Sequence, residues 1–220
     1  EHPEDAVEAI SQLAWIIENE AEAECRKQAV YALSSVTREF PDIAKSHAEV
    51  LKAVVLDDGA ADPVRLNATA ALGRIVSEDP RVGIDIVDEL VELFDTDNPK
   101  LRNNAIGLIA DVATVHTDVV EPYVDDIAPL LETDDTFTRI NASGALSRVA
   151  EDFPAAVDPL TPALIELLND TDPQARQNAC WGLGYLNAED ATANLEECAS
   201  QDDDQDVRSR ASWALSQIKQ

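Results

Sequence analysis

The amino-acid sequence predicts an all-α protein, a right-handed α-α superhelix built from six stacked helix pairs. Three observations support this prediction. Aromatic residues make up only 5% of the chain and 7 of its 220 residues are glycine, a composition that favours helices over the strands and tight turns of a β-protein. Apolar residues recur at helical spacing along most of the chain. Finally, one arginine-centred pattern occurs six times, which indicates an internal repeat.

The second helix of each repeat is predicted from this pattern. The six arginines are separated by 39, 37, 37, 37 and 32 residues. They are Arg26, Arg65, Arg102, Arg139, Arg176 and Arg208. An alanine always follows three positions later, and aliphatic residues follow seven and ten positions later, so all three lie on one stripe of a helix. We expect the alanine column to be buried, because a larger side chain would push the neighbouring helix away.

The first helix of each repeat is predicted from an apolar-periodic segment that precedes the arginine, as in residues 160–168. Acidic turns join the two helices. In residues 95–99 and 169–173, and at Asp62 and Pro63, an Asp or Asn precedes a proline, which predicts a helix N-cap followed by the first helical residue. We therefore expect one domain over residues 1–220, with repeats at approximately 4–40, 41–79, 80–115, 116–153, 154–188 and 189–219.

The repeat length and the turn Asp97-Asn98-Pro99-Lys100-Leu101-Arg102 resemble those of HEAT repeats. The second helices that begin near Arg176 and Arg208 are more similar to armadillo repeats. Both resemblances imply a solenoid, because a single helix pair cannot bury its apolar face without a neighbour. The resemblance implies a non-catalytic scaffold for protein-protein interaction, although such solenoids carry out many different tasks.

The charge of the chain limits its partners. It has 16 basic and 44 acidic side chains, a formal charge of −28. Such a surface repels nucleic-acid phosphates, and it lacks the basic cluster that attracts a membrane surface, so we expect neither nucleic acid nor membrane as a partner. The excess of Asp over Glu and the scarcity of lysine resemble proteins of salt-accumulating halophilic archaea. At molar salt the Debye length is about 3 Å, which screens most of the self-repulsion.

The chain shows no pattern typical of catalysis or of a cofactor or metal site. His2, His47 and His116 are isolated and none precedes a glutamate, so the paired His-Glu motifs of iron-binding HEAT-like hydroxylases are absent. Cys180 and Cys198 have no histidine nearby in sequence, and we interpret them as small packing residues. Three cysteines without a CxxC spacing argue against a disulfide framework or a zinc site and favour a reducing, cytoplasmic location. The acidic run at residues 202–206 predicts a solvated turn and helix cap.

A groove for a partner is predicted from the positions two, five and nine after each arginine. The first of these columns contains four asparagines in mid-helix, where asparagine is unfavourable, so the column needs an explanation. In armadillo-like proteins such a row binds the backbone of an extended peptide, often beside tryptophans. We expect a partner peptide or helix to bind at Asn67, Asn104, Asn141, Asn178, Trp181, Tyr185 and Trp213. The alternative is that each amide ties one repeat to the next.

Three further expectations complete the sequence analysis. The six repeated arginines should form a structural ladder with the acidic turns rather than a ligand site. HEAT-like repeats also occur in bilin lyases, so Trp181 and Trp213 stacking on a planar cofactor is the alternative function. No polar capping helix follows Ile218 and the chain does not begin with methionine, so we expect either a longer chain or self-association through the C-terminal end.

Overall fold

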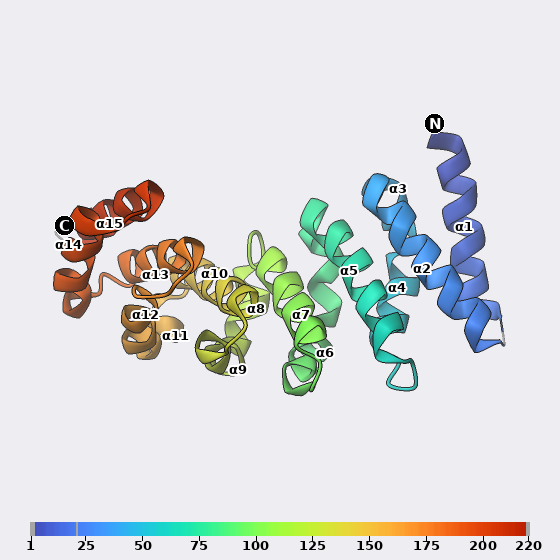
Figure 1. Ribbon diagram of the computed structural model, residues 1–220, viewed down its shortest axis with the longest axis horizontal. Helices are drawn as coiled ribbons and strands as arrows, with labels where there is room; N and C mark the ends of the chain where they lie inside the picture. Colours follow the sequence, from blue (N-terminus) through green and yellow to red (C-terminus); the bar gives the residue numbers. More distant parts are fainter. Residues whose placement is uncertain (1–2, 21, 219–220) are drawn as a thin grey trace. The chain divides into compact units, whose positions relative to one another are not determined.

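The structure is a computed structural model, and it describes residues 3–20 and 22–218. Every regular element among these residues is a helix, so the all-α prediction is confirmed (Figure 1). The chain divides into two compact units, Glu1–Val112 and Ala113–Gln220. Each unit contains layers of paired helices. None of the helices in the described ranges is long and apolar enough to cross a membrane.

The first unit contains three helix pairs. Its second helices, α2, α5 and α7, pack side by side, and the first-helix segments, of which α1 is the longest, pack against them (Figure 1). The helices are α1 (Pro3–Asn19), α2 (Ala23–Glu39), α3 (Pro41–Ala44), α4 (Ala48–Val55), α5 (Asp62–Glu78), α6 (Val87–Glu92) and α7 (Pro99–Val112). Three 3₁₀ segments join them: η1 (Lys45–His47), η2 (Pro80–Ile86) and η3 (Leu93–Asp95).

The second unit is built in the same way around α10, α13 and α15. Its helices are α8 (Thr117–Val120), α9 (Val124–Ile127), α10 (Thr136–Asp152), α11 (Pro154–Val157), α12 (Thr161–Leu167), α13 (Pro173–Tyr185), α14 (Thr192–Gln201) and α15 (Gln205–Ile218). The 3₁₀ segments are η4 (Glu121–Tyr123), η5 (Ala128–Glu132), η6 (Asp158–Leu160) and η7 (Glu189–Ala191).

Several of the first helices are broken into short α and 3₁₀ pieces, which the apolar periodicity did not reveal. Pro122, Pro129 and Pro159 lie inside the 3₁₀ segments η4, η5 and η6. Proline has no backbone N–H and its ring clashes with the preceding turn, so a continuous α-helix is interrupted at these positions. The second helices have no internal proline, and they form continuous helices of 13–17 residues.

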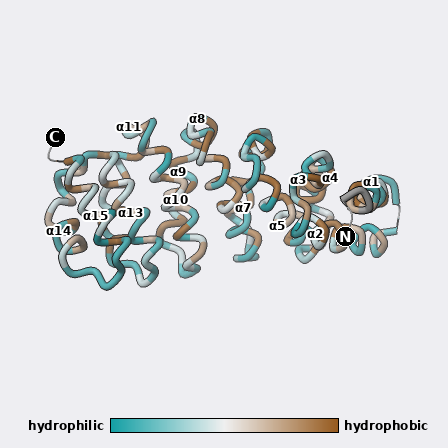
Figure 2. Tube along the Cα trace, turned by 90° about the horizontal axis from the view of Figure 1, so that it is seen from above, coloured by the Kyte–Doolittle hydropathy of each residue, from teal (hydrophilic) through white to brown (hydrophobic). Residues whose placement is uncertain are grey.

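The alanine column lies in the core, as predicted. Ala29 is 4% exposed and the other five alanines are fully buried. They are Ala68, Ala105, Ala142, Ala179 and Ala211. The helices approach closely there: the Ser147 hydroxyl of α10 lies 2.7 Å from the backbone carbonyl of Asn178 in α13. In Figure 2, hydrophobic and hydrophilic residues alternate along the second helices, as expected for helices with one buried side.

Of the three N-caps predicted before a proline, two are present and one is not. Asn98 and Asp172 each accept a hydrogen bond from a backbone N–H in the first turn of the following helix. Asp135, which sequence analysis did not identify, does the same for α10. Asp62 does not act as the cap of α5, because that helix begins one residue earlier than predicted and Ala61 takes the cap position.

Candidate functional site

The repeated arginines connect each second helix to the turn that precedes it. Five of them donate a hydrogen bond to a backbone carbonyl of that turn. These are Arg65 to Val55 (2.9 Å), Arg102 to Thr96 (2.6 Å), Arg139 to Thr133 (2.8 Å), Arg176 to Asp170 (2.9 Å) and Arg208 to Asp202 (2.7 Å). Arg26 is exposed, and among the described residues no such bond is seen for it.

In the second unit, two of these arginines also reach the turn of the next repeat. Arg139 donates from Nε and Nη2 to the Asp170 carboxylate at 2.6 and 3.1 Å. Arg176 makes the same bidentate contact with the Asp202 carboxylate, donating from Nε and Nη2 at 2.8 Å each. The two carboxylates are only 5% and 7% exposed, so these pairs are largely shielded from solvent. Asp202 therefore departs from the predicted solvated turn.

The contacts with arginine shift the pKa values of Asp170 and Asp202. Hydrogen bonds from Arg176 hold the pKa of Asp202 below its usual range, although burial acts in the opposite direction. Burial also raises the pKa of Asp170, but the hydrogen bonds from Arg139 and from the backbone N–H of Asp172 outweigh it and keep that pKa low. Both aspartates are therefore charged in the folded protein at neutral pH.

In the first unit, a buried lysine links two neighbouring repeats. Lys52 is 6% exposed, and its ammonium contacts Glu49 at 2.8 Å and Asp85 at 2.7 Å. Burial lowers the pKa of Lys52, but the two carboxylates outweigh it and raise the pKa above its usual value. Lys45 pairs with Asp79 within its own repeat. A lysine thus links two repeats of the first unit, whereas arginines link the repeats of the second.

The asparagine column has several environments. The Asn178 carboxamide is 6% exposed and donates to the Ile140 carbonyl (3.0 Å) and the Ser143 hydroxyl (3.1 Å), both in α10. Its oxygen accepts from Gln174 at 3.2 Å. The Asn178 amide thus connects its own repeat to the preceding one, as in the alternative to peptide binding considered in the sequence analysis.

The other three asparagines are half-buried. Asn67 donates to the Pro63 carbonyl of its own helix, α5, at 2.8 Å. Asn104 lies at the corresponding position of α7. Asn141 occupies the corresponding position of α10 in the second unit, where it already has an interaction partner. Unlike Asn178, these three residues are only half-buried.

The structure brings the predicted aromatic residues of the second unit together. The centroid of the Tyr185 ring lies 5.1 Å from that of Trp213, with the two rings edge to face, and 6.1 Å from that of Trp181. The Arg210 guanidinium lies over both indoles, 4.6 Å from the Trp181 centroid and 5.8 Å from the Trp213 centroid. All four side chains are half-buried, so part of each ring remains accessible. These four residues are the aromatic cluster of α13 and α15.

The aromatic cluster has an acidic neighbour. Burial and the nearby Glu151 carboxylate raise the pKa of Tyr185. The cluster can thus offer aromatic faces, a phenol and the Arg210 guanidinium to a partner, beside one carboxylate.

Sequence analysis did not identify the role of Arg210. It occurs in the column that contains asparagine in the four preceding repeats, and it lies three residues before Trp213 on α15, a spacing that places the two side chains on the same side of a helix. The three-residue spacing between Arg210 and Trp213 was the sequence feature that could have identified this contact.

Packing of α15 against α13 also depends on Gly184, because a Cβ atom there would lie 2.5 Å from the Trp213 ring.

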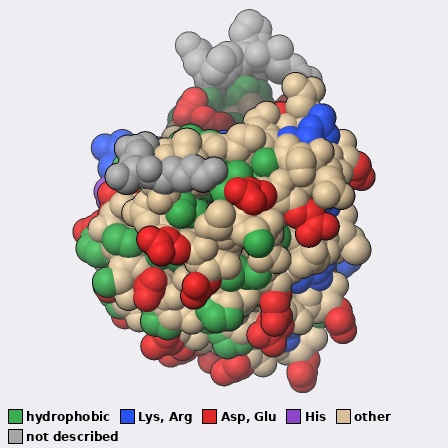
Figure 3. Space-filling view, turned by 90° about the vertical axis from the view of Figure 1, so that its left-hand side faces the viewer, with side chains coloured by type: hydrophobic (Ala, Val, Ile, Leu, Met, Phe, Trp, Pro, Cys, Tyr) green, Lys and Arg blue, Asp and Glu red, His purple; other side chains and the backbone are tan. Residues whose placement is uncertain are grey.

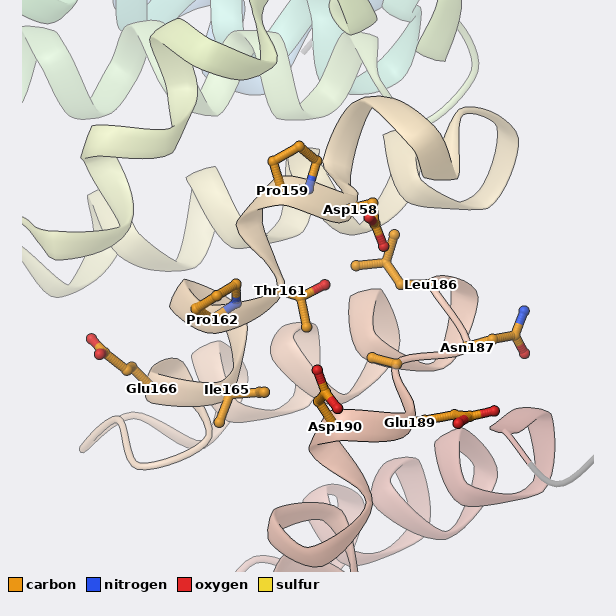
Figure 4. A pocket seen from close by; sticks show the side chains of 11 residues that line it. Asp158, Pro159, Thr161, Pro162, Ile165, Glu166, Leu186, Asn187, Glu189 and Asp190 are labelled. Carbon is orange, nitrogen blue, oxygen red and sulfur yellow. The ribbon is translucent and has the colours of Figure 1, made fainter.

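Two cavities were not predicted. One, of about 740 Å³, lies between η6, α12 and the connection after α13, with apolar walls that include Pro162, Ile165 and Leu186 (Figure 4). Its polar rim includes Asp158, Glu166, Glu189 and Asp190. The other, of about 680 Å³, lies in the first unit among α1, α2, α4 and the start of α5. No group of three or more His, Cys, Asp or Glu side chains in the described part of the chain could hold a metal ion.

The end of the second unit that carries α14 and α15 is seen in Figure 3. Acidic side chains are scattered over this surface among smaller hydrophobic ones. Residues 219 and 220, where the missing cap was inferred, lie outside the described residues. Self-association through this end stays a prediction.

Comparison with known proteins agrees with this geometry. Residues 161–220 match the family model described as HEAT repeats. No curated protein sequence matches the chain.

Solved structures show the fold more completely. An engineered protein is 20% identical, with a TM-score of 0.77 over 98% of this chain and 96% of its own. A designed armadillo repeat protein in complex with the peptide (KR)4 is 18% identical, with a TM-score of 0.73 over 96% of this chain and 98% of its own. The archaeal HEAT-like repeats protein from Thermococcus onnurineus NA1 is 14% identical, with a TM-score of 0.67 over 97% of this chain and 92% of its own. The chain has the fold of a HEAT/armadillo-like α-solenoid.

Proposed function

We propose that the protein is a non-catalytic scaffold and that its second unit binds a peptide segment of another protein. The observation that carries this proposal is the half-exposed aromatic cluster formed by Trp181, Tyr185, Trp213 and Arg210. Tryptophan, tyrosine and arginine are the residues most enriched among those that dominate binding energy at protein interfaces. A cluster serving only as core would be expected to be fully buried, and this one is not.

The proposed partner segment is basic and contains arginine. The formal charge of −28 attracts a basic segment over long distances and raises its association rate. The two indoles already hold the Arg210 guanidinium, which indicates that their faces suit this group. The designed armadillo protein with a similar fold was solved with the basic peptide (KR)4. In our proposal, an arginine of the partner takes the place of Arg210 on the indole faces.

The asparagine column has a limited part in this proposal. Asn141 is half-buried on α10 and is proposed to contact the backbone of the segment. Within the first unit, Asn67 and Asn104 are proposed to contact a peptide backbone at the corresponding positions of α5 and α7. Asn178 supports the site indirectly, since its carboxamide is committed to α10.

The proposal is tested by fluorescence anisotropy with a labelled (KR)4 peptide at low and at molar KCl. The double variant W181A/W213A should lose affinity by about 30-fold or more, as expected for removal of residues worth at least about 2 kcal/mol. The matched control is W15A, because Trp15 is 62% exposed on α1, far from the cluster in sequence. R210A should strengthen binding, since it frees the indole faces. Equal affinity of the double variant and the wild type would refute the proposal.

The same protein preparation addresses the bilin-lyase-like alternative. A planar cofactor stacked on Trp181 and Trp213 would give the purified native protein visible absorbance. The scaffold proposal expects no such absorbance, and a coloured ligand that W181A/W213A fails to retain would favour the alternative.

A further inference from the structure

The cavity beside α12 lies where the fifth repeat is shorter than its neighbours. Arg176 and Arg208 are separated by 32 residues, whereas the three preceding intervals are 37 residues each. The difference begins at the end of the second helix. α10 extends 13 residues beyond its repeated arginine and ends at Asp152, whereas α13 extends nine and ends at Tyr185. One helical turn is therefore missing at the end of α13, and the cavity of about 740 Å³ lies beside the connection that replaces it.

This connection is held in place by backbone hydrogen bonds. The N–H of Asn187 donates to the Gly184 carbonyl at 3.2 Å, and the N–H of Ala188 donates to the Leu183 carbonyl at 3.1 Å. Asn187 has a positive φ of 49°, a conformation that asparagine adopts more readily than most residues and that ends the helix. The wall formed by residues 186–190 is therefore preformed, as is usual for small-molecule sites.

The floor of the cavity is apolar. It includes Pro159, Pro162 and Ile165 from η6 and α12, and Leu186 and Ala188 from the connection (Figure 4). Ile165 and Leu186 are half-buried, so part of each side chain can contact a ligand. Contact with methylene groups would remove this apolar surface from water, which is favourable. The volume falls within the range of about 300–1,000 Å³ that is typical of small-molecule sites.

The rim of the cavity carries only negative charge. The charged residues that line it are Asp158, Glu166, Glu189 and Asp190. Among residues 3–20 and 22–218, none of these four carboxylates makes an ion pair or a side-chain hydrogen bond. In the view of Figure 4, Asp158 and Asp190 lie on opposite sides of Thr161. The carboxylates repel one another, and a cation from outside the chain would offset this repulsion.

We propose that this cavity binds a linear aliphatic polyamine, a chain of methylene groups that carries several ammonium groups. The methylenes lie on the apolar floor, and the ammonium groups pair with rim carboxylates from different elements. Several separated charges suit a rim of four carboxylates better than the single charge of a lysine side chain. In the described part of the chain, no group of His, Cys, Asp or Glu could hold a metal ion instead. The proposal is independent of peptide binding at the aromatic cluster.

The test is isothermal titration calorimetry of the full chain with the triamine spermidine at physiological ionic strength. We expect one saturable equivalent per chain. D158N/D190N should weaken binding by about tenfold or more, because two charge-assisted contacts are lost and tenfold corresponds to about 1.4 kcal/mol. I165S leaves the charge unchanged and should weaken binding by about threefold or more, because methylene contacts on the floor are lost.

The matched control is D125N/D126N, which removes the same charge from exposed positions of α9 in the same unit. Its affinity should stay within about twofold of the wild type, because charges beyond a Debye length of about 8 Å are largely screened. W181A/W213A should bind spermidine as tightly as the wild type, which separates this test from that of the peptide proposal. Circular dichroism checks that each variant keeps its helical spectrum.

Three results would overturn the proposal. Equal losses of affinity in D158N/D190N and D125N/D126N would mean that spermidine responds only to net charge. Displacement of spermidine by magnesium chloride at equal charge concentration, or unchanged binding by folded I165S, would mean that the apolar floor has no part. Displacement by (KR)4, with peptide affinity that also depends on Asp158 and Asp190, would assign the cavity to a protein partner.

Discussion

Replacement of Arg176 with methionine (R176M) should strongly destabilise the second unit. Arg176 is 9% exposed and makes two hydrogen bonds of 2.8 Å to the Asp202 carboxylate, which is 7% exposed. Removing one member of a buried ion pair costs about 3–5 kcal/mol, because the other charge is left without compensation. Asp202 keeps a hydrogen bond of 2.9 Å from the backbone of Asp204, so we expect the lower end of this range. A loss of about 3 kcal/mol lowers the Tm of a chain of this size by about 6–12 °C.

The assay is thermal unfolding followed by circular dichroism at physiological ionic strength and in molar KCl. The effect of R176M should persist at high salt, since buried pairs are screened much less than exposed ones. The matched control is R38M, because Arg38 is exposed on α2 and its loss should change stability by no more than about 0.5 kcal/mol. R176M/D202N should recover part of the loss, because the unpaired charge is removed. A Tm of R176M within about 1 °C of the wild type would refute the reasoning.

Three further predictions concern pH, packing and salt. The lowered pKa values of Asp170 and Asp202 stabilise the folded state fully above the unfolded value of about 3.9, and this stabilisation is lost as the pH falls through the lower folded values. Acid titration should therefore show a Tm that declines below about pH 4, and less steeply in R176M. G184A should lose about 1–3 kcal/mol in chemical denaturation because a Cβ atom would lie 2.5 Å from an indole ring of α15, whereas G73A should gain up to about 1 kcal/mol because its nearest neighbour lies 3.9 Å away. The Tm should rise with KCl concentration, because salt screens the self-repulsion of a chain with a formal charge of −28; a flat or falling Tm would contradict this.

The repeat architecture could be predicted from the sequence because it depends on spacing. The alanine column recurs at each second helix, and only a small side chain allows the close approach seen between α10 and α13. The broken first helices were harder to predict. Their apolar residues keep a helical period while prolines such as Pro159 force short 3₁₀ segments.

The candidate site was only partly predictable, because equivalent residues of a repeat have different neighbours. Asn178 and Asn67 occupy the same column, yet Asn178 reaches α10 and Asn67 bonds within its own helix. The residue facing Asn178 is Gly144, whose missing side chain makes room: a Cβ atom there would lie 3.3 Å from the Asn178 amide nitrogen. The corresponding position before Asn67 is Tyr31, a large side chain where Gly144 has none. A column of identical residues therefore does not imply a column of identical roles.

The arginines of the second unit connect its repeats in a directional way. Asp170 accepts the Arg139 side chain of the preceding repeat at its carboxylate and the Arg176 side chain of its own repeat at its backbone carbonyl. Asp202 does the same one repeat later, with Arg176 at the carboxylate and Arg208 at the carbonyl. Each turn is thus held from both sides, and a loss at one turn also weakens the support of the next. Because Arg176 contacts both turns, it joins the start of α13 to the turn that precedes it and to the turn that follows α14, so its loss weakens both connections.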